Sequence, residues 1–113
     1  MTTSPGWRET TGDVKIPNPR LLALFRGPGP CELCLRWCDR EPHHHLRRGM
    51  GGCALDVPHN LIAVCRPCHR AVHGGRILDR QVLDVIARRV GRTAQDVEAD
   101  LLRLRNLPKE GTP

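Results

Sequence analysis

All six cysteines and all six histidines of this 113-residue chain lie between Cys31 and His73. Two Cys-x-x-Cys pairs, CELC at 31–34 and CRPC at 65–68, are separated by thirty residues. Each pair can turn two thiolates toward one ion, and four thiolates form the closed tetrahedral shell that zinc takes at structural sites. We therefore predict a structural Zn²⁺ held by four cysteines: Cys31, Cys34, Cys65 and Cys68.

The main alternative for these cysteines is a redox dithiol. A redox dithiol needs only one Cys-x-x-Cys pair at the start of a helix, so it would not explain the second pair. Cys38 and Cys53 stand outside both pairs, although Cys38 follows Cys34 by four residues and could replace a ligand. We leave both out of the predicted site because single thiols commonly serve as small apolar side chains.

The histidines indicate a second metal site. His69 and His73 are one helical turn apart, directly after the second cysteine pair, so both rings can face one ion. A third ligand has to come from the run of three histidines in EPHHHLRRGMGG. In a strand, His43 and His45 face one side and His44 the other, so a ligand and a base can be neighbours. Three imidazoles with one open coordination position are typical of a catalytic centre.

Taken together, CELC, HHH, GMGG, HNLIAVCRPCH and His73 resemble the HNH endonucleases of the ββα-metal class. The resemblance is to small phage and bacterial members with a paired-knuckle zinc site, and it covers residues 31–75. It implies a small, zinc-stabilised α+β fold with a strand bearing the histidine pair, a glycine-containing loop, a second strand LIAVC and a helix. It also implies an enzyme that hydrolyses DNA phosphodiester bonds.

The resemblance further implies a role for each site residue. The first histidine of the pair and the helix histidines His69 and His73 bind the catalytic metal, while the second histidine activates water. Counting back from RGMGG makes His43 the ligand and His44 the general base, with Asn60 orienting the His44 ring. Taken alone, Asn60 would be a loop residue.

Two other histidines need a separate prediction. His45 stands where family members commonly carry an arginine, so a shifted register with His44 as ligand and His45 as base stays open. His59 lies outside the motif and is expected at the surface.

The expected substrate is DNA, cut by nicking or by double-strand cleavage. An all-imidazole shell suits Zn²⁺, Ni²⁺, Co²⁺ or Mn²⁺ better than Mg²⁺, but family members are commonly assayed with Mg²⁺ or Mn²⁺. The catalytic ion therefore stays open among Mg²⁺, Mn²⁺, Ni²⁺ and Zn²⁺. The formal charge is +6, and sixteen of the eighteen basic residues are arginines, whose forked donors suit phosphate. The arginines predicted to contact DNA are Arg47, Arg48, Arg70 and Arg76; an ordinary solvated basic face is the alternative.

The competing hypothesis is a zinc-stabilised nucleic-acid-binding module without catalysis. Such a module explains the four cysteines and the charge, but not the histidines and Asn60 as a set. Phage packaging proteins are a further expected partner, because HNH proteins near packaging machinery can act as both nuclease and adaptor.

The rest of the chain has to position these residues. With 39% hydrophobic residues, one Phe, two Trp and no Tyr, the chain has a small core that bound zinc would have to support. We predict a flexible leader at residues 1–19, the nuclease core at 20–77 and a helical extension at 78–107. In that extension, LDRQVLDVIARRV has helical spacing up to Gly91, and Thr93 can cap a second helix. We expect these helices to pack on the core rather than to read DNA as a helix-turn-helix.

The start of the chain has no apolar signal core, and no apolar run in the sequence is long enough to span a membrane. We therefore expect a cytoplasmic location, in a bacterium or a phage-infected host, and no membrane partner. In that compartment thiols serve as metal ligands more often than as disulfides.

Overall fold

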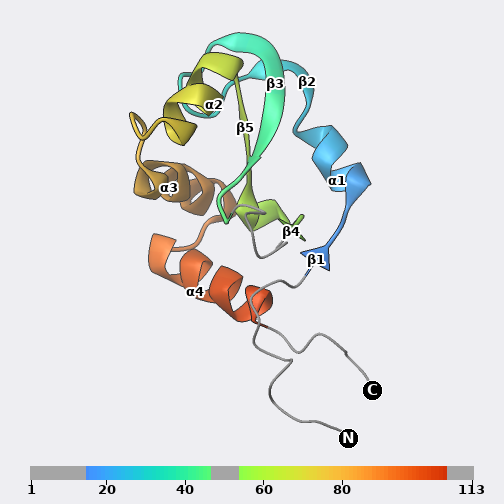
Figure 1. Ribbon diagram of the computed structural model, residues 1–113, viewed down its shortest axis with the longest axis vertical. Helices are drawn as coiled ribbons and strands as arrows, with labels where there is room; N and C mark the ends of the chain where they lie inside the picture. The colour runs from blue at the N-terminus through green and yellow to red at the C-terminus, as the bar shows by residue number, and fades with distance from the viewer. Residues whose placement is uncertain (1–14, 47–53, 107–113) are drawn as a thin grey trace, which may run out of the picture.

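A computed structural model of the chain describes residues 15–46 and 54–106. These residues form a small α+β fold, shown in Figure 1, with a three-stranded antiparallel sheet at its centre. The sheet contains β2 (Gly27–Pro30), β3 (Trp37–His44) and β5 (Leu61–Val64), and β3 lies in the middle. The α+β class predicted from the sequence is therefore confirmed.

Strand β3 contains His43 and His44, and β5 contains the LIAV segment. All four residues of β5 are buried, as expected for an apolar strand covered on both faces. Along the end of β3, His43 is buried and His44 is half-buried, and His43 pairs with Ile62 of β5. This alternation turns neighbouring histidines to opposite faces of the strand.

The edge strand β2 was not predicted. Its sequence is GPGP. The structure pairs it with β3, from Gly27 opposite Arg40 to Pro30 opposite Trp37. Proline is tolerated here because an edge strand leaves one row of its N–H positions unpaired.

The N-terminal part of the fold begins earlier than predicted. Strand β1 (Lys15–Ile16) pairs in parallel with β4 (Ala54–Leu55), and Asn18 caps α1 (Pro19–Leu24) by accepting the Leu21 N–H. Residues 15–19, predicted as the end of a flexible leader, contain β1 and the first residue of α1. Residues 1–14 lie outside the described part of the chain.

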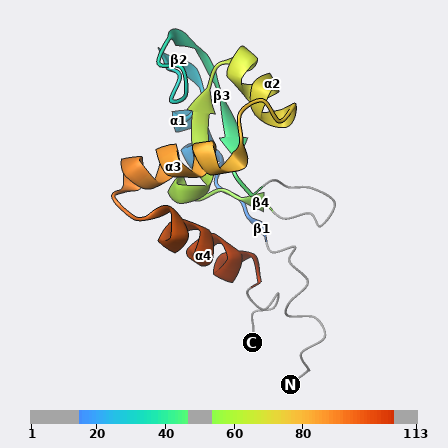
Figure 2. The same cartoon turned by 90° about the vertical axis from the view of Figure 1, so that its left-hand side faces the viewer.

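Three further helices follow the sheet. Helix α2 (Arg66–His73) begins directly after Cys65, as predicted. The extension forms α3 (Asp79–Val90) and α4 (Ala94–Arg105), and Figure 2 shows α3 passing across the lower end of the sheet with α4 below it. Gly91 ends α3 with a positive φ of 72°, and the Thr93 hydroxyl caps α4 by accepting the Asp96 N–H. Both predicted helices and both of their signals are thus confirmed.

The sheet and the last two helices share one hydrophobic core. Residues from β5, α2, α3 and α4 are buried in a single cluster whose largest members include Ile62, Val64, Ile86 and Leu101. The extension therefore packs against the core, as expected.

No helix in the described ranges is long and apolar enough to cross a membrane.

A short 3-10 helix, η2 (Pro58–Asn60), links the core to α4. His59 Nε2 lies 2.8 Å from Asp100 Oδ2, and the ring is half-buried, so the expectation of a surface residue is corrected. Hydrogen bonds from Arg103 and then from His59 hold the pKa of Asp100 below its usual range. This pair fixes α4 against the segment that leads into β5.

Candidate metal centres

The four predicted zinc ligands lie together at one end of the sheet. Four sulfur atoms all lie within 4.8 Å of one another, those of Cys31, Cys34, Cys65 and Cys68. Cys34 Sγ lies 3.7 Å from Cys65 Sγ. The four cysteines are thus positioned to bind one metal ion, and a shell of four sulfurs fits zinc.

The first zinc knuckle, which is the turn that carries Cys31 and Cys34, is held by hydrogen bonds that involve its own backbone. Cys31 N donates to Arg36 O, Leu35 N donates to Cys31 O, and the Cys31 sulfur accepts the N–H groups of Leu33 and Cys34 at 3.4 Å. Leu35 takes a positive φ of 69°, an uncommon conformation for a residue with a side chain. Backbone geometry therefore preorganises the turn that presents the first two sulfurs.

The pKa values of three of these thiols are shifted by their surroundings. Hydrogen bonding from the Arg36 backbone, opposed by burial, lowers the pKa of Cys34 to about 6. Burial raises the pKa of Cys65, and burial together with neighbouring sulfurs raises the pKa of Cys68. Four thiolates at these distances repel one another, and a divalent cation removes that penalty.

Cys38 lies outside the four-sulfur group, in agreement with its omission from the predicted ligands. It is half-buried and packs against the hydrophobic core, and burial raises its pKa. Cys53 lies outside the described residues.

The second cluster joins β3 to α2. His43, His69 and His73 each offer a ring nitrogen, and these nitrogens all lie within 4.8 Å of one another. The ring centroids are 5.1 Å apart for His43 and His69, 5.4 Å for His43 and His73, and 4.8 Å for His69 and His73. The three rings thus come together as the sequence predicted. His43 is buried whereas His73 is exposed, so the cluster opens toward solvent on the α2 side.

A carboxylate that the sequence analysis missed orients one of these rings. Glu41 Oε1 lies 2.9 Å from His69 Nδ1, and Glu41 Oε2 accepts from Arg66 at 2.7 Å. The hydrogen bonds with His69 and Arg66 lower the pKa of Glu41, which keeps it ionised at neutral pH. An ionised carboxylate only accepts hydrogen bonds, so Nδ1 of His69 is the donor and Nε2 keeps the lone pair that a metal ion would need.

The predicted base, His44, contacts an aspartate. Its Nε2 lies 2.7 Å from Asp56 Oδ1, and Asp56 is 3% exposed. The sequence had assigned Asn60 to orient this ring. The structure corrects that expectation, because the Asn60 side chain bonds to backbone groups instead: its Oδ1 accepts from Leu46 N at 2.7 Å, and its Nδ2 donates to the carbonyls of Leu46 and Leu55. Asn60 therefore holds together the two ends of the segment that joins β3 to β4.

The neighbouring His45 is buried, at 8% exposed. Its backbone N–H donates to Asn60 O, which extends the pairing of β3 beyond its last strand residue. Both registers of the histidine pair remain as the sequence left them, but burial makes His45 the less accessible of the two candidate bases.

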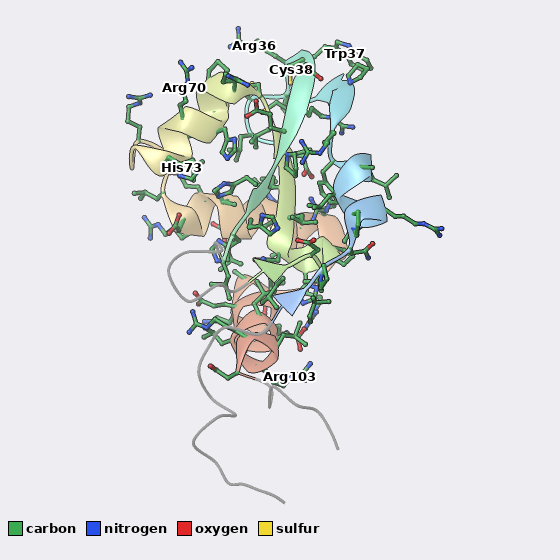
Figure 3. All side chains as sticks on the ribbon, turned by 45° about the vertical axis from the view of Figure 1, so that its right-hand side comes forward. Arg36, Trp37, Cys38, Arg70, His73 and Arg103 are labelled. Carbon is green, nitrogen blue, oxygen red and sulfur yellow. The ribbon has the colours of Figure 1, made fainter. Side chains whose placement is uncertain are left out.

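The predicted DNA-contacting arginines are only partly described. Arg47 and Arg48 lie outside the described residues, and Arg76 is exposed in the turn after α2. Arg70 is exposed on α2 and lines an open hollow of about 270 Å³ together with the cluster histidines of that helix, Glu41 and Arg66. Figure 3 shows Arg70 and His73 on α2, far from Arg103 on α4.

The residues that the sequence analysis missed differ in how they could have been found. Glu41 stands two positions before His43 on the same strand, so strand alternation places both on one face. Asp56 has no such signal, because it reaches His44 only through the placement of β4.

The two clusters offer different chemistry. The cysteines form a closed shell that suits a structural ion, whereas three imidazoles leave a coordination position for water or a substrate oxygen. No model of a protein family matches the chain, and no curated protein or solved structure matches it either.

Proposed function

We propose that the protein is a metal-dependent endonuclease of the HNH, ββα-metal class that hydrolyses phosphodiester bonds of DNA. The observation that carries the proposal is the cluster of His43, His69 and His73, formed between a strand and the helix that begins inside the second Cys-x-x-Cys pair. A binding module without catalysis has no need for three imidazoles that face one point and open toward solvent. The DNA contacts of Arg70 and Arg76 are part of the same proposal.

The histidine cluster would hold one divalent ion, with Mg²⁺, Mn²⁺, Ni²⁺ and Zn²⁺ as the candidates. Bound there, the ion would act as a Lewis acid that polarises a phosphoryl oxygen and stabilises the leaving oxygen. Glu41 fixes the ring of His69 so that Nε2 is available for this ion. The four cysteines would hold a separate structural Zn²⁺.

The remaining chemistry is assigned to side chains outside the cluster. His44 takes a proton from the water that attacks phosphorus, which is the usual task of a neutral imidazole near pH 7. Exposed arginines around the hollow, such as Arg70, bind the phosphates of the strand. DNA is the expected partner, and phage packaging proteins are a second partner that the nuclease could serve.

A plasmid cleavage assay tests this function. The full-length zinc-loaded protein is expected to nick or linearise plasmid when Mg²⁺, Mn²⁺, Ni²⁺ or Zn²⁺ is added, and excess EDTA is expected to stop the reaction. His69→Ala is the matched control, because it should lose cleavage while it keeps the zinc of the cysteine site and its circular dichroism spectrum. DNA binding without cleavage under every ion would instead support the non-catalytic module.

A further inference from the structure

The contact between His44 and Asp56 is short, and it is more buried than an ordinary surface ion pair. The His44 Nε2 to Asp56 Oδ1 distance is 2.7 Å, and the carboxylate belongs to a residue that is 3% exposed. Burying a carboxylate is unfavourable unless hydrogen bonds compensate for the lost water. The hydrogen bond to the His44 ring is therefore one of the bonds that compensate for the burial of the Asp56 carboxylate.

Both oxygens of Asp56 have partners. Oδ2 accepts the backbone N–H of Asn18 at 2.9 Å, while the backbone N–H of Asp56 donates to Ile16 O at 3.0 Å. These contacts tie the carboxylate to β1 and to the start of α1, and the pairing of β1 with β4 holds the same segment. The carboxylate is thus fixed independently of the histidine that it faces.

We propose that Asp56 is a positioning residue that holds His44 in the tautomer with the proton on Nε2 and the lone pair on Nδ1. An ionised carboxylate can only accept, so the ring nitrogen that faces it has to be the donor. The other nitrogen, Nδ1, is then the atom that takes the proton from water. This inference rests on the proposed nuclease function for its catalytic consequence, but the tautomer itself does not depend on that function.

The substitution Asp56→Asn tests the proposal because an amide has one oxygen where the carboxylate has two. If that oxygen continues to accept the Asn18 N–H, the amide NH₂ group faces His44 and favours the opposite tautomer, with the proton on Nδ1. The matched control is Asp39→Asn, since Asp39 is an exposed aspartate on the same strand as His44.

In the wild-type protein, NMR correlation of the ring nitrogens with the ring protons of His44 should show the proton on Nε2. In D56N the proton should move to Nδ1. The kcat for plasmid cleavage should fall by about 10²-fold or more, while KM and the content of both metals stay unchanged, since a base with its lone pair on the wrong nitrogen cannot act. D39N should behave as wild type.

The outcomes separate this inference from the proposed function. A wild-type His44 with its proton on Nδ1 overturns the inference whether or not the protein cuts DNA, and this measurement needs no variant that folds. A wild-type protein that cuts DNA, together with a folded D56N that cuts it equally fast, also overturns the inference alone. A protein that never cuts DNA but carries the Nε2 proton contradicts the proposed function and leaves the tautomer assignment supported.

Discussion

At the scale of single residues, the three consecutive histidines have different surroundings. His43 is buried and faces the rings of His69 and His73 on α2. His44 is half-buried and contacts Asp56, and His45 is buried just after the last residue of β3. Strand alternation explains why neighbours differ, since adjacent side chains point to opposite faces. Of the two candidate bases, His44 is the one whose ring nitrogen meets a fixed carboxylate.

The register of the histidine pair is tested by two alanine substitutions. His44→Ala should lower the cleavage rate by about 10²–10⁴-fold, because a general base contributes that much, and should leave both metals bound. His45→Ala should retain cleavage. Rates from single-turnover plasmid cleavage and metal content from mass spectrometry check this; an inactive His45→Ala beside an active His44→Ala would establish the shifted register.

The buried amide of Asn60 gives a stability prediction at the same scale. Asn60→Ala should lower the free energy of unfolding by roughly 1–3 kcal/mol, because it leaves backbone groups of Leu46 and Leu55 without their partner. Urea titration measures the change. Asn106→Ala, at an exposed helix end, is the control and should stay within about 0.5 kcal/mol of wild type. Equal effects of the two substitutions would contradict the anchoring role.

At the scale of elements, α3 holds the first zinc knuckle against the sheet. Arg89 of α3 binds both carboxylate oxygens of Glu32, at 2.7 and 2.8 Å, and also donates to Leu61 O and Pro58 O. Glu32 lies between the first two cysteines and in turn accepts the Ala63 N–H of β5 at 2.8 Å. A residue of the helical extension thus connects the knuckle, η2 and β5.

Removal of this connection should destabilise the protein. Arg89→Ala is expected to lower the free energy of unfolding by about 1.5–3 kcal/mol, since it removes charge-assisted hydrogen bonds and leaves two carbonyls with fewer partners. Its neighbour Arg88 is exposed on the same helix turn, and Arg88→Ala should change stability by less than about 0.5 kcal/mol. Thermal and urea unfolding of both variants measure the difference. If Arg89→Ala were as stable as Arg88→Ala, α3 would be a passive cover.

At the scale of the whole molecule, the cysteine cluster joins distant parts of the chain. Two sulfurs come from the turn between β2 and β3, and two come from the start of α2. One bound ion would therefore link that turn to α2. The core beneath it is small, with apolar side chains such as Leu55, Ile62 and Leu101 fully buried. In so small a domain the free energy of metal binding becomes free energy of folding.

The role of the cysteine cluster is tested by a matched pair of substitutions. Cys34→Ser should lose zinc and with it cooperative unfolding, because one of four ligands is missing. Cys38→Ser should keep one equivalent of structural zinc and fold normally, since Cys38 lies outside the four-sulfur group. Metal analysis and circular dichroism distinguish the two. Zinc retained in Cys34→Ser but lost in Cys38→Ser would mean that Cys38 is the ligand.

The local spacing of residues in the sequence determines several helices and the ligand pairs of both clusters. The Cys-x-x-Cys pairs, the spacing of His69 and His73, the glycine that ends α3 and the cap of α4 are all short-range features, and each appears as predicted. Such features follow from helix and strand periodicity, which acts over a few residues.

Only the tertiary structure decided which side chains support the site. Asp56 reaches His44 across twelve positions, Arg89 reaches Glu32 across fifty-seven, and Asn60 bonds the ends of a segment instead of the ring assigned to it. Strand β2 likewise exists because β3 lies beside it. These partners are set by how β4, α3 and the sheet pack together, and packing over such separations leaves no periodic pattern in the sequence.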